Sequence, residues 1–129
     1  MNVLVLEDNP ANLLLVAAVL GRAGHRLHAA HSVAEFEAAL SASRPDVVLL
    51  DLQLPDGDGL RLVGRLKSEP ATAAIAVIAL TAYATAADRA QGLAAGCDAY
   101  ITKPIDTRTF AAEVAAIAGR GFHGPCSAG

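Results

Sequence analysis

Short, mostly apolar segments alternate with longer segments of helical periodicity along the 129-residue chain. A parallel strand that is buried on both faces has no polar side, so it reads as a continuous apolar run. The run VVLL that ends at Leu50 has this form. From this pattern we expect five strands, at 3–6, 25–30, 46–50, 75–80 and 99–102.

Helix signals stand between these strands. Asn9 followed by Pro10 supplies an N-cap and a proline at the first helical position. Ser32 with Glu35 three residues later forms a capping-box sequence, and Gly24 stands where a helix can end in the left-handed conformation. The expected helices are 10–22, 33–41, 60–66, 85–95 and 107–118.

The alternation of strands and helices predicts an α/β fold. Repeated βαβ units with right-handed crossovers produce a parallel sheet that is covered by helices on both faces. Five such units make one small, doubly wound domain. In this architecture ligands bind outside the carboxyl ends of the strands, at the point where the strand order reverses.

Reactive side chains follow four of the five expected strands. They are, in chain order, Glu7 with Asp8, then Asp51, Thr81 and Lys103. Carboxylates brought together repel one another unless a cation compensates, and oxygen ligands without His or Cys suit Mg²⁺ better than zinc. A lysine and a hydroxyl beside them would hold phosphoryl oxygens. The pattern therefore predicts Mg²⁺-dependent phosphoryl chemistry, with Asp51 forming an aspartyl phosphate.

Composition and charge narrow the class of partner. Hydrophobic residues make up 53% and charged residues 18%, which favours a compact domain. A net charge of -3 and the absence of a basic run argue against direct nucleic-acid binding. Cys97 and Cys126 lack zinc-ligand spacing, and the apolar run 13–20 is shorter than the roughly 20 residues of a membrane span. We expect a cytoplasmic protein without membrane insertion.

Several motifs in the same order occur in a known family. They are Glu7-Asp8-Asn9, Asp51 with Leu54-Pro55 and Gly59, Thr81-Ala82, Tyr100 and Lys103-Pro104. Over about residues 2–118 the chain resembles the receiver domains of two-component response regulators. It is most similar to stand-alone, single-domain receivers and to receivers carried by hybrid kinases, through the segments ALTAY and GCDAYITKPI. The resemblance implies a flavodoxin-like (βα)5 fold with strand order 2-1-3-4-5.

The resemblance also implies a phosphorylation site and a metal site. Asp51 would accept a phosphoryl group from a sensor histidine kinase or a His-containing phosphotransfer protein. Asp8, Asp51 and the backbone carbonyl of Gln53 would bind Mg²⁺, with water-mediated help from Glu7. The product would be a phosphoprotein that signals through altered protein contacts.

Four further residues would connect the phosphate to the surface. Thr81 and Lys103 would each bind a phosphoryl oxygen, and Tyr100 would swing inward as Thr81 moves. A downstream target would then bind the face formed by the fourth helix, fifth strand and fifth helix. The peptide bond before Pro104 would be cis.

We expect one receiver domain over residues 1–118 and a flexible tail over 119–129. The domain would be a signalling domain and not an enzyme, because it promotes only its own phosphorylation and dephosphorylation. A receiver-like module that binds partners regardless of phosphorylation is the main alternative, and a phosphate sink is another role. A Mg²⁺-dependent phosphatase is disfavoured because the pattern supplies no second general acid or base beside Asp51.

Three histidines, His25, His28 and His31, lie close together in the sequence. Side chains alternate across a strand, so His28 is expected on the opposite face from the other two. We therefore expect no metal site there.

Overall fold

The computed structural model describes residues 2–7, 9–42, 44–51, 53–54, 57–81, 90, 94, 96–102 and 105–123. At 53–54, 57–60, 81, 102 and 119–123 it describes the backbone only.

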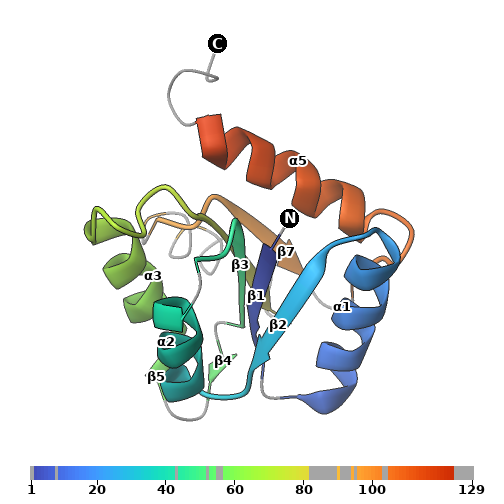
Figure 1. Ribbon diagram of the computed structural model, residues 1–129, viewed down its shortest axis with the longest axis horizontal. Helices are drawn as coiled ribbons and strands as arrows, with labels where there is room; N and C mark the ends of the chain where they lie inside the picture. Colours follow the sequence, from blue (N-terminus) through green and yellow to red (C-terminus); the bar gives the residue numbers. More distant parts are fainter. Residues whose placement is uncertain are drawn as a thin grey trace.

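Five parallel strands form the central sheet (Figure 1). They are β1 (Asn2–Leu6), β2 (Arg26–Ala30), β3 (Val47–Asp51), β6 (Ala76–Thr81) and β7 (Ala99–Thr102). Their spatial order is β2-β1-β3-β6-β7, which confirms the predicted order, since β6 and β7 are the fourth and fifth strands of the sheet. The order reverses between β1 and β3, so the carboxyl ends of these two strands flank the switch point of the fold.

Helices cover both faces of this sheet. They are α1 (Pro10–Arg22), α2 (Val33–Ala42), α3 (Gly59–Ser68) and α5 (Phe110–His123). Figure 1 shows α1 and α5 on one face and α2 and α3 on the other. The helix expected over 85–95 falls largely outside the described residues. None of the helices in the described ranges is long and apolar enough to cross a membrane.

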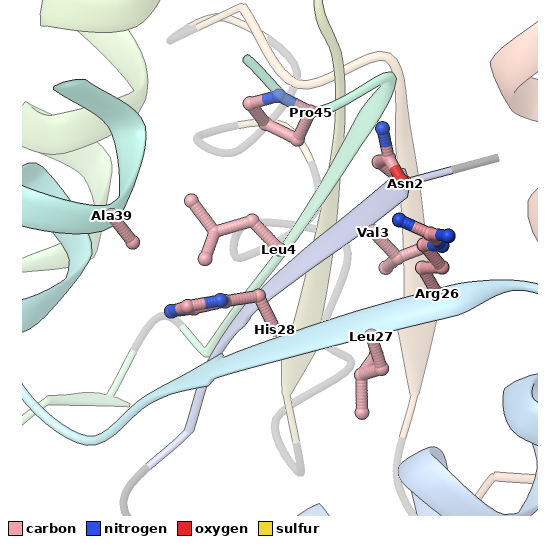
Figure 2. Close-up of a pocket in the computed structure, with 8 residues that line it drawn as sticks. All are labelled: Asn2, Val3, Leu4, Arg26, Leu27, His28, Ala39 and Pro45. Carbon is pink, nitrogen blue, oxygen red and sulfur yellow. The ribbon is translucent and has the colours of Figure 1, made fainter. Parts of the chain in front are cut away.

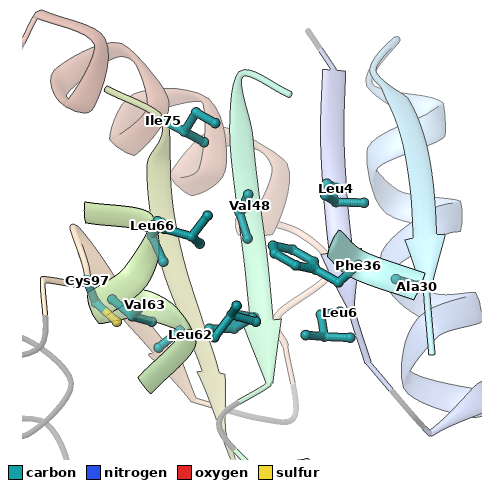
Figure 3. Close-up of a cluster of buried hydrophobic side chains, with 13 residues drawn as sticks. Leu4, Leu6, Ala30, Phe36, Val48, Leu62, Val63, Leu66, Ile75 and Cys97 are labelled. Carbon is teal, nitrogen blue, oxygen red and sulfur yellow. The ribbon is translucent and has the colours of Figure 1, made fainter. Parts of the chain in front are cut away.

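The alternation of side chains along the strands divides the core into two layers. Val3 and Val5 of β1 join the layer under α1 and α5, whereas Leu4 and Leu6 join the layer under α2 and α3. Figure 3 shows the second layer, in which the fully buried Phe36 of α2 lies against the sheet. Burying a large apolar side chain stabilises the fold by about 1.5–3 kcal/mol, so both layers hold the strands in register.

The predicted helix starts are present with one change of partner. The Asn9 side chain accepts hydrogen bonds from the backbone N–H groups two and three residues on, at 2.9 and 3.3 Å. Ser32 Oγ accepts from the Glu35 N–H at 3.2 Å, which is the first half of a capping box. The Glu35 carboxylate accepts from the His31 N–H and not from that of Ser32. Gly24 lies in the turn between α1 and β2 and has φ +90°, in the left-handed region.

Two backbone features differ from the expected elements. Residues Gln53–Leu54 (β4) and Gly57–Asp58 (β5) form a short antiparallel pair where only a turn was expected. The prediction that the last helix ends at Ala118 is wrong, because α5 continues to His123. A glycine inside a helix costs only about 1 kcal/mol, so Gly119 and Gly121 do not stop it. Residues 124–129 lie outside the described part, and their flexibility stays a prediction.

Candidate functional site

The carboxyl ends of β1 and β3 bring two acidic residues together. In this parallel pair Leu6 lies opposite Leu50, so Glu7 and Asp51 are the next residues in the same register. Adjacent strands lie about 4.8 Å apart, which makes the two backbones direct neighbours. The predicted meeting of Glu7 and Asp51 at one sheet edge is therefore present.

Both acidic side chains are buried. Glu7 is 0% exposed and Asp51 is 4% exposed, so the sheet holds them at its end and not in open solvent. The Glu7 N–H donates to the Ala30 carbonyl at 3.1 Å, which extends the pairing of β1 with β2 by one residue. Asp51 is the last residue of β3, and all the preceding residues of that strand are buried. The carboxylates are thus positioned by the buried strands at the centre of the sheet.

A buried pair of carboxylates suits a hard divalent cation. Two neighbouring negative charges removed from water are costly unless a positive charge compensates them. Of the other predicted ligands, Gln53 begins β4 two residues after Asp51, so its backbone carbonyl lies close along the chain. Asp8 lies outside the described residues. Within the described part, no three His, Cys, Asp or Glu side chains gather as a metal site.

The predicted phosphate-binding residues are the last residue of β6, Thr81, and the residue directly after β7, Lys103. Asp51 lies opposite Leu80 in the β3–β6 pair, which places Thr81 one residue further along the same edge. Thr81 lies in turn opposite Thr102 at the end of β7. Lys103 and Pro104 follow Thr102 directly and lie outside the described residues.

Tyr100 stands in β7 opposite Ala79 of β6. It is half-buried and packs against the core layer under α2 and α3. The side chain is therefore a packing residue at the rim of the core in this structure. A movement between buried and exposed positions stays a prediction.

An anchor that the sequence pattern did not reveal holds the start of β7. Lys67 Nζ donates to Asp98 Oδ2 and to the Ile75 carbonyl, both at 2.8 Å. The Val77 N–H donates to the same Asp98 oxygen at 2.7 Å. One carboxylate thus joins α3, the first residues of β6 and the turn before β7. The lysine and aspartate lie too far apart in the sequence for any local pattern to pair them.

Cys97 is buried next to this anchor. Burial raises the pKa of the Cys97 thiol from 9.0 to about 11, and the negative charge of Asp98 adds to the effect. The thiol therefore stays protonated and packs as a small apolar group at neutral pH.

A narrow crevice beside Glu7 adds residues that sequence analysis did not single out. Its volume is ≈ 10 Å³, about the space of one water molecule. The residues that line it are Glu7, Asn12, Leu15, Val16, Leu80 and Ile105. Ile105 comes directly after Lys103-Pro104 in the sequence, and this position could have predicted that it lies near the site.

The sequence model of the response regulator receiver domain matches residues 3–115. The DNA-binding dual master transcriptional regulator RpaA of Synechocystis is 36% identical over 115 residues, which cover 89% of this chain and 48% of RpaA. The polar-differentiation response regulator DivK of Brucella anthropi is 34% identical over 84% of this chain and 89% of DivK. The chain thus spans about half of RpaA and most of DivK.

Solved structures agree with the fold. The receiver domain of a signal transduction histidine kinase from Syntrophus aciditrophicus has a TM-score of 0.82 and 30% identity, over 92% of this chain and 89% of that one. The Mn²⁺-bound form of the response regulator Rcp1 has a TM-score of 0.76 and 27% identity, over 90% of each chain. The resemblance expected from the motifs is confirmed. This chain belongs to the response regulator receiver domain family of two-component signalling systems.

Proposed function

We propose that Asp51 is the phosphoryl acceptor of this receiver domain. The observation that carries the proposal is the buried pair of Glu7 and Asp51 at the ends of adjacent parallel strands. A carboxylate at the end of a rigid strand can meet a donor with little loss of side-chain freedom. Asp51 also lies opposite Leu80 in the β3–β6 pair, so Thr81, the next residue of β6, stands beside it along the same edge.

The reaction is a transfer from a phosphohistidine. A carboxylate oxygen of Asp51 attacks the phosphorus, a P–O bond forms and the P–N bond to the imidazole breaks. The electron pair of the broken bond stays on the imidazole nitrogen, which can then take up a proton. The donor would be a sensor histidine kinase or a His-containing phosphotransfer protein, and the imidazole would serve as the leaving group.

A divalent cation, with Mg²⁺ as our proposal, would supply positive charge to the transferring group when bound. Asp8, Asp51 and the backbone carbonyl of Gln53 would hold it, and Glu7 would act through water. Glu7 and Asp51 fit a divalent-cation site because both are buried carboxylates, which offer oxygen atoms to the metal. The Mn²⁺ in the related Rcp1 structure supports a divalent ion in this family.

Thr81 and Lys103 would then bind the phosphoryl oxygens. The register of β6 with β7 supports this role for Thr81, since it lies opposite the residue before Lys103. A hydroxyl and an ammonium group would donate hydrogen bonds to oxygens that carry negative charge. In this proposal the peptide bond between Lys103 and Pro104 is cis.

The signal would reach other proteins through Tyr100. This residue sits at the rim of the core, opposite Ala79, which is two residues before Thr81 in β6, and we propose that a shift of Thr81 changes how deeply its ring packs. Phosphorylation would shift an equilibrium between two positions of the ring and alter the face formed by residues 85–95, β7 and α5. A downstream protein would bind that face.

The donor would approach over α1. Leu14 is 73% exposed on this helix, and the neighbouring Leu15 lines the crevice beside Glu7. Leu15 itself is 37% exposed, so an apolar side chain beside Glu7 is open to the helices of a partner protein.

We propose that this domain does not contact nucleic acid directly. We also propose that its reaction takes place in the cytoplasm. In RpaA, which is named as DNA-binding, this chain matches about half of the length.

Intact mass spectrometry tests the acceptor directly. The protein is incubated with Mg²⁺ and acetyl phosphate, and with acetyl phosphate and a chelator. One phosphoryl adduct that requires the metal is expected. Asp51→Asn should lose the adduct, and the control Asp46→Asn should keep it, because Asp46 lies at the opposite end of β3.

Two results would overturn the assignment. An adduct of unchanged yield on folded Asp51→Asn would place the phosphate on another residue. No adduct, together with no binding of a stable phosphoryl mimic by the folded protein, would favour a module that binds partners regardless of phosphorylation.

A further inference from the structure

A second cavity opens at the other end of the sheet, between β1, β2 and α2 (Figure 2). Its volume is ≈ 320 Å³, within the range of small-molecule pockets. The residues that line it are Asn2, Val3, Leu4, Arg26, Leu27, His28, Ala39 and Pro45. It lies at the amino ends of the strands, whereas Glu7 and Asp51 lie at their carboxyl ends. The cavity is therefore separate from the phosphoryl-acceptor site.

β2 carries two polar side chains, Arg26 and His28, on the face that lines this cavity. Side chains alternate along a strand, so Arg26 and His28 share the face of Ala30, which belongs to the core layer under α2 and α3. On β1 the corresponding inner position, opposite His28, is the buried Leu4. His28 thus occupies a position where the neighbouring strand carries a core residue, whereas Arg26 lies opposite the exposed Asn2.

The small side chains of α2 leave the space open. Ala39 is the α2 residue that faces the cavity, and Pro45 is a second, buried apolar residue at its lining. Figure 2 shows His28 extending from β2 toward Ala39, with Leu4 beside it. A longer residue than alanine at position 39 would cover Leu4. The cavity therefore has an apolar floor and a polar rim.

The charges at the rim favour an anion. Arg26 carries a positive charge, and the side chains of Arg26 and His28 make no hydrogen bond or ion pair with any other described residue. No acidic residue lines the cavity, and Asp46, which follows the lining residue Pro45, accepts a hydrogen bond from the Asn2 N–H at 2.7 Å. Donor groups that still have hydrogen-bonding capacity remain on Arg26, His28 and the Asn2 amide.

We propose that this cavity binds a small organic anion, a carboxylate attached to a compact apolar body. The carboxylate would lie against Arg26, whose planar guanidinium can donate two parallel hydrogen bonds, with His28 as a further donor. The apolar body would cover Leu4, Ala39 and Pro45. The site is independent of phosphorylation at Asp51, so its test uses the unphosphorylated protein.

Benzoate is the probe, and backbone amide shifts in two-dimensional NMR spectra are the readout. Saturable shifts at Leu4, Arg26, His28 and Ala39 are expected, with a Kd of about 1 mM for a ligand of this size. Benzamide has the same shape without the charge, and inorganic phosphate has charge without the apolar body. Both should bind at least about fivefold more weakly.

Variants separate this site from general charge attraction. Arg26→Gln is expected to weaken benzoate binding by about tenfold, since it removes a charge-assisted pair of hydrogen bonds. Arg22→Gln removes the same charge from an exposed position on α1, on the opposite face of the sheet, and should leave the Kd unchanged. Both positions are exposed, so neither variant should unfold the protein.

Three results would overturn the proposal. The first is the absence of saturable shifts up to about 20 mM benzoate, well above the expected Kd. The second is binding to Arg26→Gln that equals binding to the unaltered protein. The third is equal affinity for benzamide, which would show an apolar cavity without anion recognition.

Discussion

The change Asp98→Ala removes the carboxylate that joins α3, β6 and β7. In the folded protein this group accepts from Lys67 Nζ at 2.8 Å and from the Val77 N–H at 2.7 Å. The ion pair is sheltered, with the Lys67 and Asp98 side chains only 21% and 28% exposed. Asp98→Ala should therefore destabilise the fold much more than the loss of a surface ion pair.

The expected loss can be worked from these contacts. Val77 is buried in β6, and its N–H would lose its acceptor, which costs about 1–3 kcal/mol. Lys67 would lose one charge-assisted bond but keep the carbonyls of Ala73 and Ile75, at a cost of about 1 kcal/mol. The free energy of unfolding should thus fall by about 2–4 kcal/mol. The Tm should fall by about 10 °C.

Urea unfolding followed by circular dichroism measures this loss. Glu37→Ala is the matched control, because it removes a carboxylate that contacts Arg65 at 2.7 Å with both side chains well exposed. Its cost should be about 0–1 kcal/mol. Asp98→Asn keeps an acceptor for the Val77 N–H and should lose about half as much as Asp98→Ala. An Asp98→Ala loss under about 0.5 kcal/mol, or one equal to that of Glu37→Ala, would refute the argument.

Three further changes test the local structure. Gly96→Ala should cost about 1–3 kcal/mol in urea unfolding, since Gly96 has φ +117° and a Cβ would lie 2.8 Å from Lys67 Cγ; an unchanged midpoint would contradict this. Asn9→Ala should cost about 1 kcal/mol by removing the cap of α1, and Asn9→Asp should retain most of that stability. In a Cys126→Ser background, a thiol reagent at pH 8 should label native Cys97 about 100-fold more slowly than a cysteine peptide, because its pKa is raised to about 11; equal rates would exclude a buried thiol. Because the pKa of Cys97 is higher in the folded protein than in the unfolded chain, the protonated thiol contributes to stability in full below pH 9.0. This contribution should be lost as the pH rises toward about 11, and Cys97→Ala should not show that loss.

Local patterns were sufficient for the five strands of the central sheet and the starts of α1 and α2, but not for the short β4–β5 pair. Apolar runs located β1, β3 and β6, and Asn9-Pro10 and Ser32 located two helix starts, because strand burial and capping depend on residues a few positions apart. The partly polar segments of β2 and β7 were located by the helix signals on either side of them. The right-handed connection rule then placed Glu7, Asp51 and Thr81 along one edge. The α5 end was missed because the cost of a helical glycine is small and neighbouring turns can outweigh it.

Contacts between distant segments emerged only in the folded chain. The amino-acid sequence was enough to predict the parallel sheet, its helical layers and the acidic edge, because these follow from periodicity and chain order. It could not pair Lys67 with Asp98, which are 31 residues apart, or place Ala39 opposite His28 across an open cavity. Such contacts depend on how helix and sheet surfaces pack, where a change of one side chain decides between a filled core and a pocket.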